Sequence, residues 1–275
     1  MSHCITIPPA ISLSATENFR VHQIPAGTDN LIWAIEYQVG LCAVVDGPSA
    51  VELLEYCNQH NLQITTILNT HTHGDHIGVN KDLGKRGLME KIQVYGSALR
   101  ASEIPHITHP VQDGDIIHLG ELEGKVISTE GHINGHISFL FADFLFCGDC
   151  LFSGGCGYLF DGPPSKMFHS LQKLACLADD TKVCCAHEYT EDNLLFAHSI
   201  DKNNPALIER IAHVQAARRQ GKSTLPSTIA LEKATNPFVR SVSVEEFTSK
   251  RELKNAKIYK TMSFYDIHTN DINTQ

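Results

Sequence analysis

The chain has 275 residues, of which 22 are basic and 31 are acidic, so its formal net charge is −9. An acidic chain without a basic block is unsuited to non-specific nucleic-acid binding, which depends on Lys and Arg beside phosphates. We find no apolar run long enough to span a bilayer and no secretory signal at the N-terminus. We therefore expect a cytoplasmic globular protein, one large domain or a large and a small one, without nucleic-acid or membrane partners.

Residues 1–18 are rich in Pro, Ser and Thr and show no clear period, so we expect a loosely held extension there. Strands are then predicted from β-branched and aromatic runs, with a hairpin around residues 38–40. The predicted strands are 19–24, 30–37, 40–45, 64–68, 92–95, 116–117, 124–129, 138–146 and 182–185.

Helices are predicted where apolar residues recur with helical spacing. Within the part that alternates strand and helix they cover residues 51–59, 79–85 and 165–178. After about residue 188 the pattern is helical only, over 192–199, 206–220 and 244–254. This change predicts a mixed α and β domain over 19–188 and a smaller helical domain over 189–275.

Nine cysteines form an odd set, and several of them lie inside apolar strand-like runs. Cys147 and Cys150 have C-x-x-C spacing, but a zinc ribbon requires a second such pair and a redox motif normally opens a helix. This pair instead ends a predicted strand. We interpret the cysteines as reduced, structural thiols of a cytosolic protein.

The most informative stretch is the loop of residues 71–76, in which His71, His73, Asp75 and His76 follow a predicted buried strand. Imidazole and carboxylate groups are ligands for zinc, and also for iron or manganese. Six residues do not easily wrap four ligands around one ion. The loop therefore predicts either two adjacent ions or one ion with further ligands from elsewhere in the chain.

Three later residues have suitable chemistry and also follow predicted strands beside a small residue, namely His132, Asp149 and His187. Strand ends at one edge of a sheet bring such side chains within reach of each other. Two ions about 3.5–4 Å apart need a shared ligand, for which a carboxylate with two oxygens is best suited. We expect Asp149 to be this bridge.

The other six ligands then divide into His71, His73 and His132 for one ion, and Asp75, His76 and His187 for the other. A water between two cations is acidified far below its usual pKa of about 15.7, so hydroxide forms near neutral pH and acts as the nucleophile. We expect His136 to support this site rather than to bind metal.

These residues, with the stretches at 148–157, 186–190 and 251–255, resemble glyoxalase II, the hydroxyacylglutathione hydrolase family of the metallo-β-lactamase superfamily. The resemblance runs from about residue 19 to the C-terminal helix. It implies an αββα sandwich with a dinuclear site and a C-terminal helical domain. The implied reaction is hydrolysis of S-D-lactoylglutathione to D-lactate and glutathione, the second step of methylglyoxal detoxification, with two divalent ions, zinc first among them. We expect a monomer.

By position, Arg251 and Lys254 match the family's basic pair for the glycine carboxylate of glutathione, and Tyr189 matches a tyrosine that contacts glutathione. Without the resemblance, the basic pair would be interpreted as a solvated helix face. Tyr158 occupies a substrate-contacting position at which the family usually has a basic residue. Phe160 occupies the following aromatic position, at which some members have tyrosine.

Three alternatives remain at this point. The first is a mononuclear iron persulfide dioxygenase of the same fold, against which the complete second ligand set argues. The second is another hydrolase of the superfamily, acting on lactones or β-lactams. The third is a metal-binding protein without catalytic activity.

Overall fold

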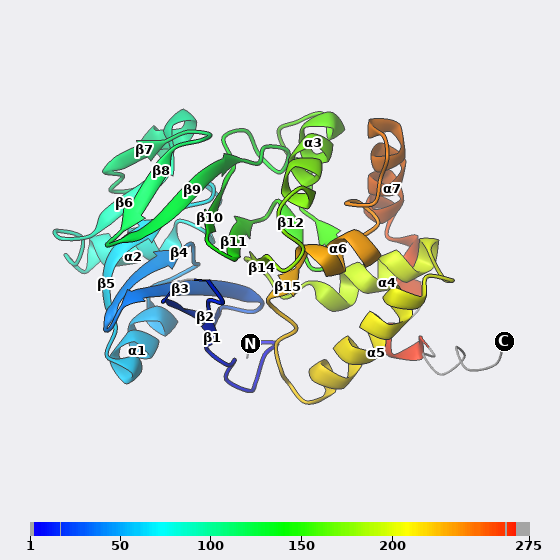
Figure 1. Ribbon diagram of the computed structural model, residues 1–275, viewed down its shortest axis with the longest axis horizontal. Coiled ribbons are helices and arrows are strands. Elements are labelled where there is room, and N and C mark those ends of the chain that lie inside the picture. Colours follow the sequence, from blue (N-terminus) through cyan, green and yellow to red (C-terminus); the bar gives the residue numbers. More distant parts are fainter. Residues whose placement is uncertain (1–2, 17, 262, 268–275) are drawn as a thin grey trace.

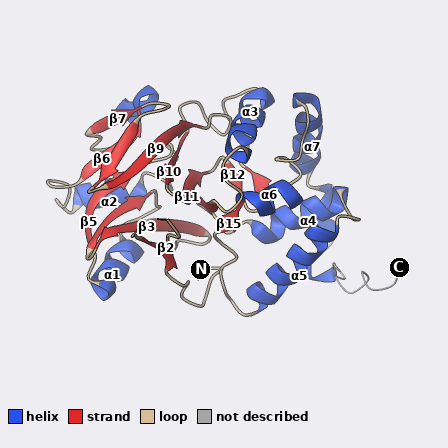
Figure 2. Ribbon diagram, in the orientation of Figure 1, coloured by secondary structure: helices blue, strands red, loops and turns tan. Residues whose placement is uncertain are grey.

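The structure is a computed structural model that describes residues 3–16, 18–261 and 263–267. Two β-sheets pack against each other on one side of the molecule, and a group of helices from the C-terminal part lies on the other side (Figure 1). Figure 2 shows the same division between strands and helices. Among the described residues, no helix combines the length and apolar character that a membrane span requires.

The first sheet contains seven strands in the order of the chain. Neighbours pair antiparallel from β1 to β4 and parallel from β4 to β7. The strands are β1 (Ser12–Leu13), β2 (Arg20–Ala26), β3 (Asn30–Gln38), β4 (Leu41–Val45), β5 (Gln63–Leu68), β6 (Gln93–Ser97) and β7 (His109–Val111).

The second sheet has six strands in the order β15-β14-β11-β10-β9-β8, of which only β11 and β14 pair in parallel. A separate two-stranded hairpin, β12 (Leu151–Phe152) and β13 (Gly155–Cys156), follows β11. The six strands are β8 (Ile116–Leu119), β9 (Leu122–Ser128), β10 (Ile137–Phe141), β11 (Phe144–Gly148), β14 (Lys182–Cys185) and β15 (Ser227–Thr228).

Strand β3 shows why the sheets form a sandwich. Its residues are buried on both faces, because successive side chains point to opposite sides of a strand. Leu31, Trp33 and Ile35 belong to the core that includes the aromatic side chains of β10 and β11. Ile32 and Ala34 belong to a second core on the other face.

Helices complete the outer layers. The second core contains side chains of α1 (Val51–His60) and α2 (Gly78–Lys85), which therefore cover the first sheet. Helix α3 (Pro164–Ala175) contributes Met167, Leu171 and Leu174 to the core of the second sheet. The predicted αββα architecture is thus confirmed.

The C-terminal part is helical, as expected, with α4 (Thr190–Ile200), α5 (Pro205–Arg219), α6 (Ile229–Thr235) and α7 (Val244–Ala256). Short 3-10 segments occur at Ala98–Glu103, Ile258–Thr261 and Phe264–Asp266. Helix α6 was not predicted, and it directly follows β15, which joins the edge of the second sheet by pairing with β14. The C-terminal part is therefore tied to the sandwich through the backbone.

Two sequence predictions were wrong. The run predicted as one strand over 138–146 is the hairpin β10–β11, which turns at Ala142 with φ of +47°. Alanine and a following aspartate are a weak turn signal, and both flanking segments are equally apolar. The N-terminal segment is not loosely held where it is described, because Thr6 N donates to Gly221 O at 2.8 Å and β1 pairs with β2.

Candidate metal centre

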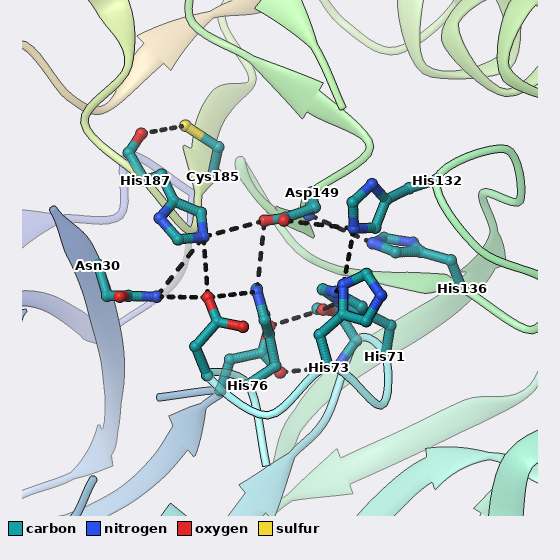
Figure 3. A network of polar contacts seen from close by, with 12 residues as sticks. Asn30, His71, His73, His76, His132, His136, Asp149, Cys185 and His187 are labelled. Atoms are coloured by element: carbon teal, nitrogen blue, oxygen red, sulfur yellow. Dashed lines mark hydrogen bonds and ion pairs between the residues drawn. The ribbon is translucent and has the colours of Figure 1, made fainter. Parts of the chain in front are cut away.

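The proposed site residues lie at the carboxyl ends of strands from both sheets. In the first sheet, the loop at 71–76 follows β5, which is parallel to β4. In the second sheet, β9 and β11 both run antiparallel to β10, and β14 runs parallel to β11. His132, Asp149 and His187 follow these three strands, so their side chains reach the same edge (Figure 3).

The two sheets are joined at this edge by short contacts. Leu31 N, at the start of β3, donates to Ala186 O at 2.7 Å, and Asn30 forms a β-bridge with His187. Gly148 has φ of +47°, and a Cβ on it would lie 2.2 Å from Thr70 Oγ1. Only glycine permits this approach of the second sheet to the loop of the first.

The first group of side chains contains three imidazoles. His73 Nδ1 lies 3.1 Å from His71 Nε2 and 3.0 Å from His132 Nε2. Together with one carboxylate oxygen of Asp149, these atoms lie within 4.8 Å of one another. Ring nitrogens at such distances point at a common centre, which suits a tetrahedral cation.

The second group lies on the other side of Asp149. His187 Nε2 is 3.3 Å from Asp75 Oδ2, and His76 Nε2 is 3.6 Å from the same oxygen. His76 Nε2 and His187 Nε2 lie 3.4 and 3.5 Å from Asp149 Oδ1. Asp149 Oδ2 instead faces His132 Nε2 at 3.4 Å, so each carboxylate oxygen faces a different group.

Two atoms of this cluster test whether cations fit it. His76 Nε2 and Asp149 Oδ1 are buried and have no hydrogen-bond partner among the described residues. Buried polar atoms without a partner are rare in folded proteins because their desolvation is not compensated. Figure 3 shows both atoms pointing into the space between the groups, so the clusters fit a dinuclear metal site.

The imidazoles are held in position by hydrogen bonds at their outer nitrogens. His76 Nδ1 donates to Asp46 Oδ2 at 2.9 Å, and His187 Nδ1 donates to Asp29 Oδ1 at 2.8 Å. His132 Nδ1 donates to the carbonyl of Tyr158 at 2.8 Å. Each bond fixes the tautomer that directs Nε2 into the site, as in other metal-binding histidines.

Electrostatics within the cluster are strongly coupled. Burial and the neighbouring His76 hold the pKa of His71 well below its usual value. Burial also opposes the charge on Asp149, but His76 and His187 nevertheless lower the pKa of this carboxyl strongly. Against the effect of burial, hydrogen bonds with Asp29 and Asp75 raise the pKa of His187 to about 9.

His136 lies behind the cluster rather than in it. It is fully buried, and its Nε2 accepts a hydrogen bond from Asp149 N at 3.2 Å. Its Nδ1 donates to Thr129 Oγ1 at 2.9 Å. Both ring nitrogens are therefore engaged, and the supporting role expected for this residue fits its contacts.

Aromatic side chains flank the cluster on two sides. The Tyr189 ring stacks on His187, with centroids 4.7 Å apart and planes within 7°. Phe160 packs edge-on against both His73 and His132, with each centroid 5.2 Å away, and Tyr158 packs against Phe160. All three aromatic rings are exposed to solvent, so they form walls that a substrate can touch.

Arg251 and Lys254 on α7 are not a solvated face, because both are buried. Arg251 Nη1 donates to Cys156 O at 3.2 Å and reaches Gly157 O at 3.5 Å. Lys254 donates to Asn193 Oδ1 and lies 3.8 Å from Asp192. Burial lowers the pKa of Lys254 to about 8, so its charge is poorly compensated.

Sequence reasoning missed Asp29 and Asp46 as partners of the histidines. Asp46 also accepts hydrogen bonds from Thr70 N and Thr70 Oγ1, and it has φ of +53°. The only sequence signal was that both carboxylates lie at a predicted strand end. All nine cysteines, by contrast, are free, as predicted, and among them only Cys176 is exposed.

The chain matches two families. Residues 32–187 match the metallo-β-lactamase superfamily, and residues 188–265 match the hydroxyacylglutathione hydrolase C-terminus. A hydroxyacylglutathione hydrolase of Aliivibrio fischeri is 44% identical over 221 residues, covering 80% of this chain and 86% of the relative. One of Thermosynechococcus vestitus is also 44% identical, over 80% of this chain and 88% of the relative.

Among solved structures, the crystal structure of ETHE1 from Myxococcus xanthus is similar, with 25% identity and a TM-score of 0.63 over 84% of this chain and 89% of that one. The B3 metallo-β-lactamase BLEG-1 has a TM-score of 0.60 at 21% identity, over 80% of this chain and 100% of that one, which shows the shared fold. With this fold, these clusters and these relatives, the chain belongs to the hydroxyacylglutathione hydrolase family of the metallo-β-lactamase superfamily.

Proposed function

We propose that this protein hydrolyses S-2-hydroxyacylglutathione thioesters, with S-D-lactoylglutathione as its substrate. The products are glutathione and D-lactate, which makes the reaction the second step of methylglyoxal detoxification. The observation that supports it best is the pair of side-chain groups that share Asp149, each carboxylate oxygen facing a different group.

In this proposal His71, His73 and His132 would hold one divalent ion, and Asp75, His76 and His187 would hold the other. Asp149 would be the ligand that both ions share. When bound, two such ions supply an acidified water near neutral pH and polarise a carbonyl oxygen. Zinc suits these nitrogen and carboxylate ligands, and iron or manganese are the alternatives.

The remaining chemistry requires little of the protein. Water gives up a proton to the solvent as its oxygen adds to the thioester carbonyl carbon, the carbon–sulfur bond breaks, and the sulfur leaves as a thiolate. The acyl group is released as a carboxylic acid, which loses the second proton to become the carboxylate. The conjugate acid of this thiolate has a pKa of about 8.5, so the thiolate can leave without being protonated first, and the site needs no separate general acid. Tyr189 and Phe160 flank the histidines and are placed to orient the acyl group and the adjacent glutathione atoms.

Arg251 and Lys254 bind the glycine carboxylate of glutathione in this proposal, and Tyr158 contacts the tripeptide. Lys254 has one acidic neighbour, Asp192 at 3.8 Å, and among the described residues Arg251 forms no ion pair, so a bound anion would supply the missing countercharge for two buried cations. We place the catalytic domain at 19–188 and the substrate-binding domain at 189–275. We further propose a monomer in the cytoplasm, where nine free thiols remain reduced.

The alternative functions are less well supported. A mononuclear persulfide dioxygenase has no use for the complete second group around His76 and His187. A lactonase or β-lactamase has no use for the buried cations on α7. A binding protein without turnover does not require a shared carboxylate between two groups.

The test combines kinetics with metal analysis on the same samples. Asp149→Ala is expected to abolish hydrolysis of S-D-lactoylglutathione and to lower the bound metal from two ions per chain, whereas Asp179→Asn, at a surface ion pair with Lys233, leaves both unchanged. Full activity with two bound ions in Asp149→Ala would contradict the bridging role. Oxygen uptake with glutathione persulfide, instead of thiol release from the thioester, would establish the dioxygenase.

A further inference from the structure

We propose that Arg210, Glu232 and Asn236, here called the hairpin anchor, are positioning residues that fix the β12–β13 hairpin between the metal centre and the cations of α7. None of the three touches the metal groups or the proposed substrate contacts. The inference rests on the proposed function, since it assigns both ends of the hairpin to one site. Besides its contacts with the metal centre and with the cations of α7, the hairpin contacts the anchor at its turn, and the inference concerns this contact.

The open end of the hairpin carries residues of both parts of the site. Asp149 lies two residues before β12, and Gly157 directly follows β13. A Cβ on Gly157 would lie 2.0 Å from Asp149 O and 2.9 Å from His132 Nδ1, so the two ends are in close contact with the first metal group. Arg251 holds the carbonyls of Cys156 and Gly157 from the other side. A shift of the hairpin therefore moves both subsites together.

The turn of the hairpin is held by the anchor. Gly154 N donates to Glu232 Oε2 at 2.8 Å, and Asn236 Nδ2 donates to Gly155 O at 2.9 Å and to Phe152 O at 3.3 Å. Arg210 Nη2 donates to Ser153 Oγ at 2.9 Å. Every residue from Phe152 to Gly155 thus forms a hydrogen bond with a residue of the anchor.

The anchor is itself buried, and its two charged groups are paired with each other. Arg210 and Glu232 form an ion pair of 2.5 Å, and the side chains of both are at most 3% exposed. Ser227 and Thr235 bond to the same pair. Hydrophobic residues of similar volume often stabilise a fold at least as well as a buried ion pair. Stability alone therefore does not account for this pair, whereas the directed bonds to the hairpin do.

A further contact joins the turn to the proposed carboxylate site. Asn193 Nδ2 donates to Ser153 O at 3.0 Å, while its Oδ1 accepts a hydrogen bond from Lys254. The turn, the anchor and Lys254 are consequently parts of one bonded network. Displacement of the turn is expected to alter glutathione binding as well as the position of Asp149.

Two double variants separate positioning from stability. Arg210→Met with Glu232→Leu removes the ion pair and the acceptor for Gly154 N. Arg210→Met with Glu232→Gln removes the charges but keeps an acceptor of the same shape. Neither leaves an unpaired buried charge, so both are expected to fold. The Leu variant leaves the N–H of Gly154 without an acceptor, so we expect its Tm to be lower than that of the Gln variant. Ser153→Ala, which removes only the bond from Arg210, is the milder third variant.

Four quantities are measured for each variant at 25 °C: Tm, the Kd for Zn²⁺, the Kd for glutathione by calorimetry, and kcat and KM with S-D-lactoylglutathione. In the Leu variant we expect kcat/KM to fall by roughly 100-fold, the effect of a misplacement of about 1 Å. The Kd for Zn²⁺ is expected to rise by about 10-fold or more, as after the loss of other residues behind metal ligands. The Gln variant recovers most of both losses, and Ser153→Ala shows smaller changes in the same direction.

The result that overturns the inference is wild-type Zn²⁺ affinity and kinetics in the folded Leu variant, or in Ser153→Ala if the Leu variant does not fold. Equal losses in the Leu and Gln variants, together with wild-type values in Ser153→Ala, also overturn it, since neither the retained acceptor at position 232 nor the bond from Arg210 to Ser153 would then have an effect. If the wild-type protein does not hydrolyse the thioester, the proposed function fails, but the Zn²⁺ affinities still decide whether the anchor positions Asp149.

Discussion

Lys254 offers a prediction in which stability and binding change in opposite directions. Its ammonium group is buried and lies 3.8 Å from Asp192, whose carboxylate already pairs with Lys260 at 2.8 Å. Burial lowers its pKa from 10.5 to about 8. A difference of this size corresponds to about 3 kcal/mol of unfavourable free energy for holding the charge in the folded protein at neutral pH.

Lys254→Met removes that unfavourable term and leaves Asn193 Oδ1 without its donor. An unsatisfied buried acceptor costs about 1–3 kcal/mol, so the net change lies between roughly zero and 2 kcal/mol in favour of the folded state. Binding changes the other way, because a hydrogen bond to a charged group contributes about 1.5–3 kcal/mol. This loss raises KM for the glutathione thioester by about 10- to 150-fold.

The assay compares Tm by calorimetry with KM and kcat for S-D-lactoylglutathione. Lys233→Met is the matched control, since Lys233 forms only a surface ion pair with Asp179. We expect Lys254→Met to show unchanged or higher Tm, raised KM and nearly unchanged kcat. A KM equal to that of the wild type would refute the assignment of Lys254 to the carboxylate. A large fall in Tm would refute the energetic reasoning.

Three further predictions concern the pH dependence of Lys254, the close packing of Gly157 and the effect of metal removal. KM of the wild type should rise as the pH passes about 8, because Lys254 then loses the proton whose charge attracts the carboxylate, and Lys254→Met should not show this rise. The free energy of unfolding of the wild type should increase from about pH 8 up to the unfolded pKa of 10.5, since the unfolded state binds more protons than the folded state in this range. Gly157→Ala should lower kcat and Tm, because the added Cβ would lie 2.0 Å from Asp149 O. Gly162→Ala serves as the control, since its Cβ would lie 3.3 Å from the Lys166 side chain and 3.8 Å from Gly131 Cα, which is close to ordinary contact. Removal of metal by a chelator should lower Tm, since ions bound only to the folded state stabilise it, and refilling with Zn²⁺ should restore it; an unchanged Tm in the metal-free protein would count against ions that link the two sheets.

Local sequence patterns determined a large part of this protein. Strand β3 could be assigned from its run of apolar β-branched and aromatic residues, and α1, α3 and α5 from apolar residues that recur with helical spacing and so share one buried face. The loop at 71–76 could be identified as a metal loop because its ligand types lie next to each other in the chain. The hairpin turn at Ala142 could not be assigned, since Asp143 alone favours a turn there and no glycine, proline or asparagine accompanies it.

Only the tertiary structure decided how distant segments meet. His132, Asp149 and His187 join the loop at 71–76 because the carboxyl ends of strands in two sheets share one edge, and no local pattern encodes that register. The same holds for two supporting carboxylates: Asp29 bonds to His187, which is 158 residues away, and Asp46 bonds to His76, which is 30 residues away. It also holds for Arg251 and Lys254, which a helical pattern alone would place in solvent. Burial and pairing of charge depend on what packs against an element, and that information lies in other parts of the chain.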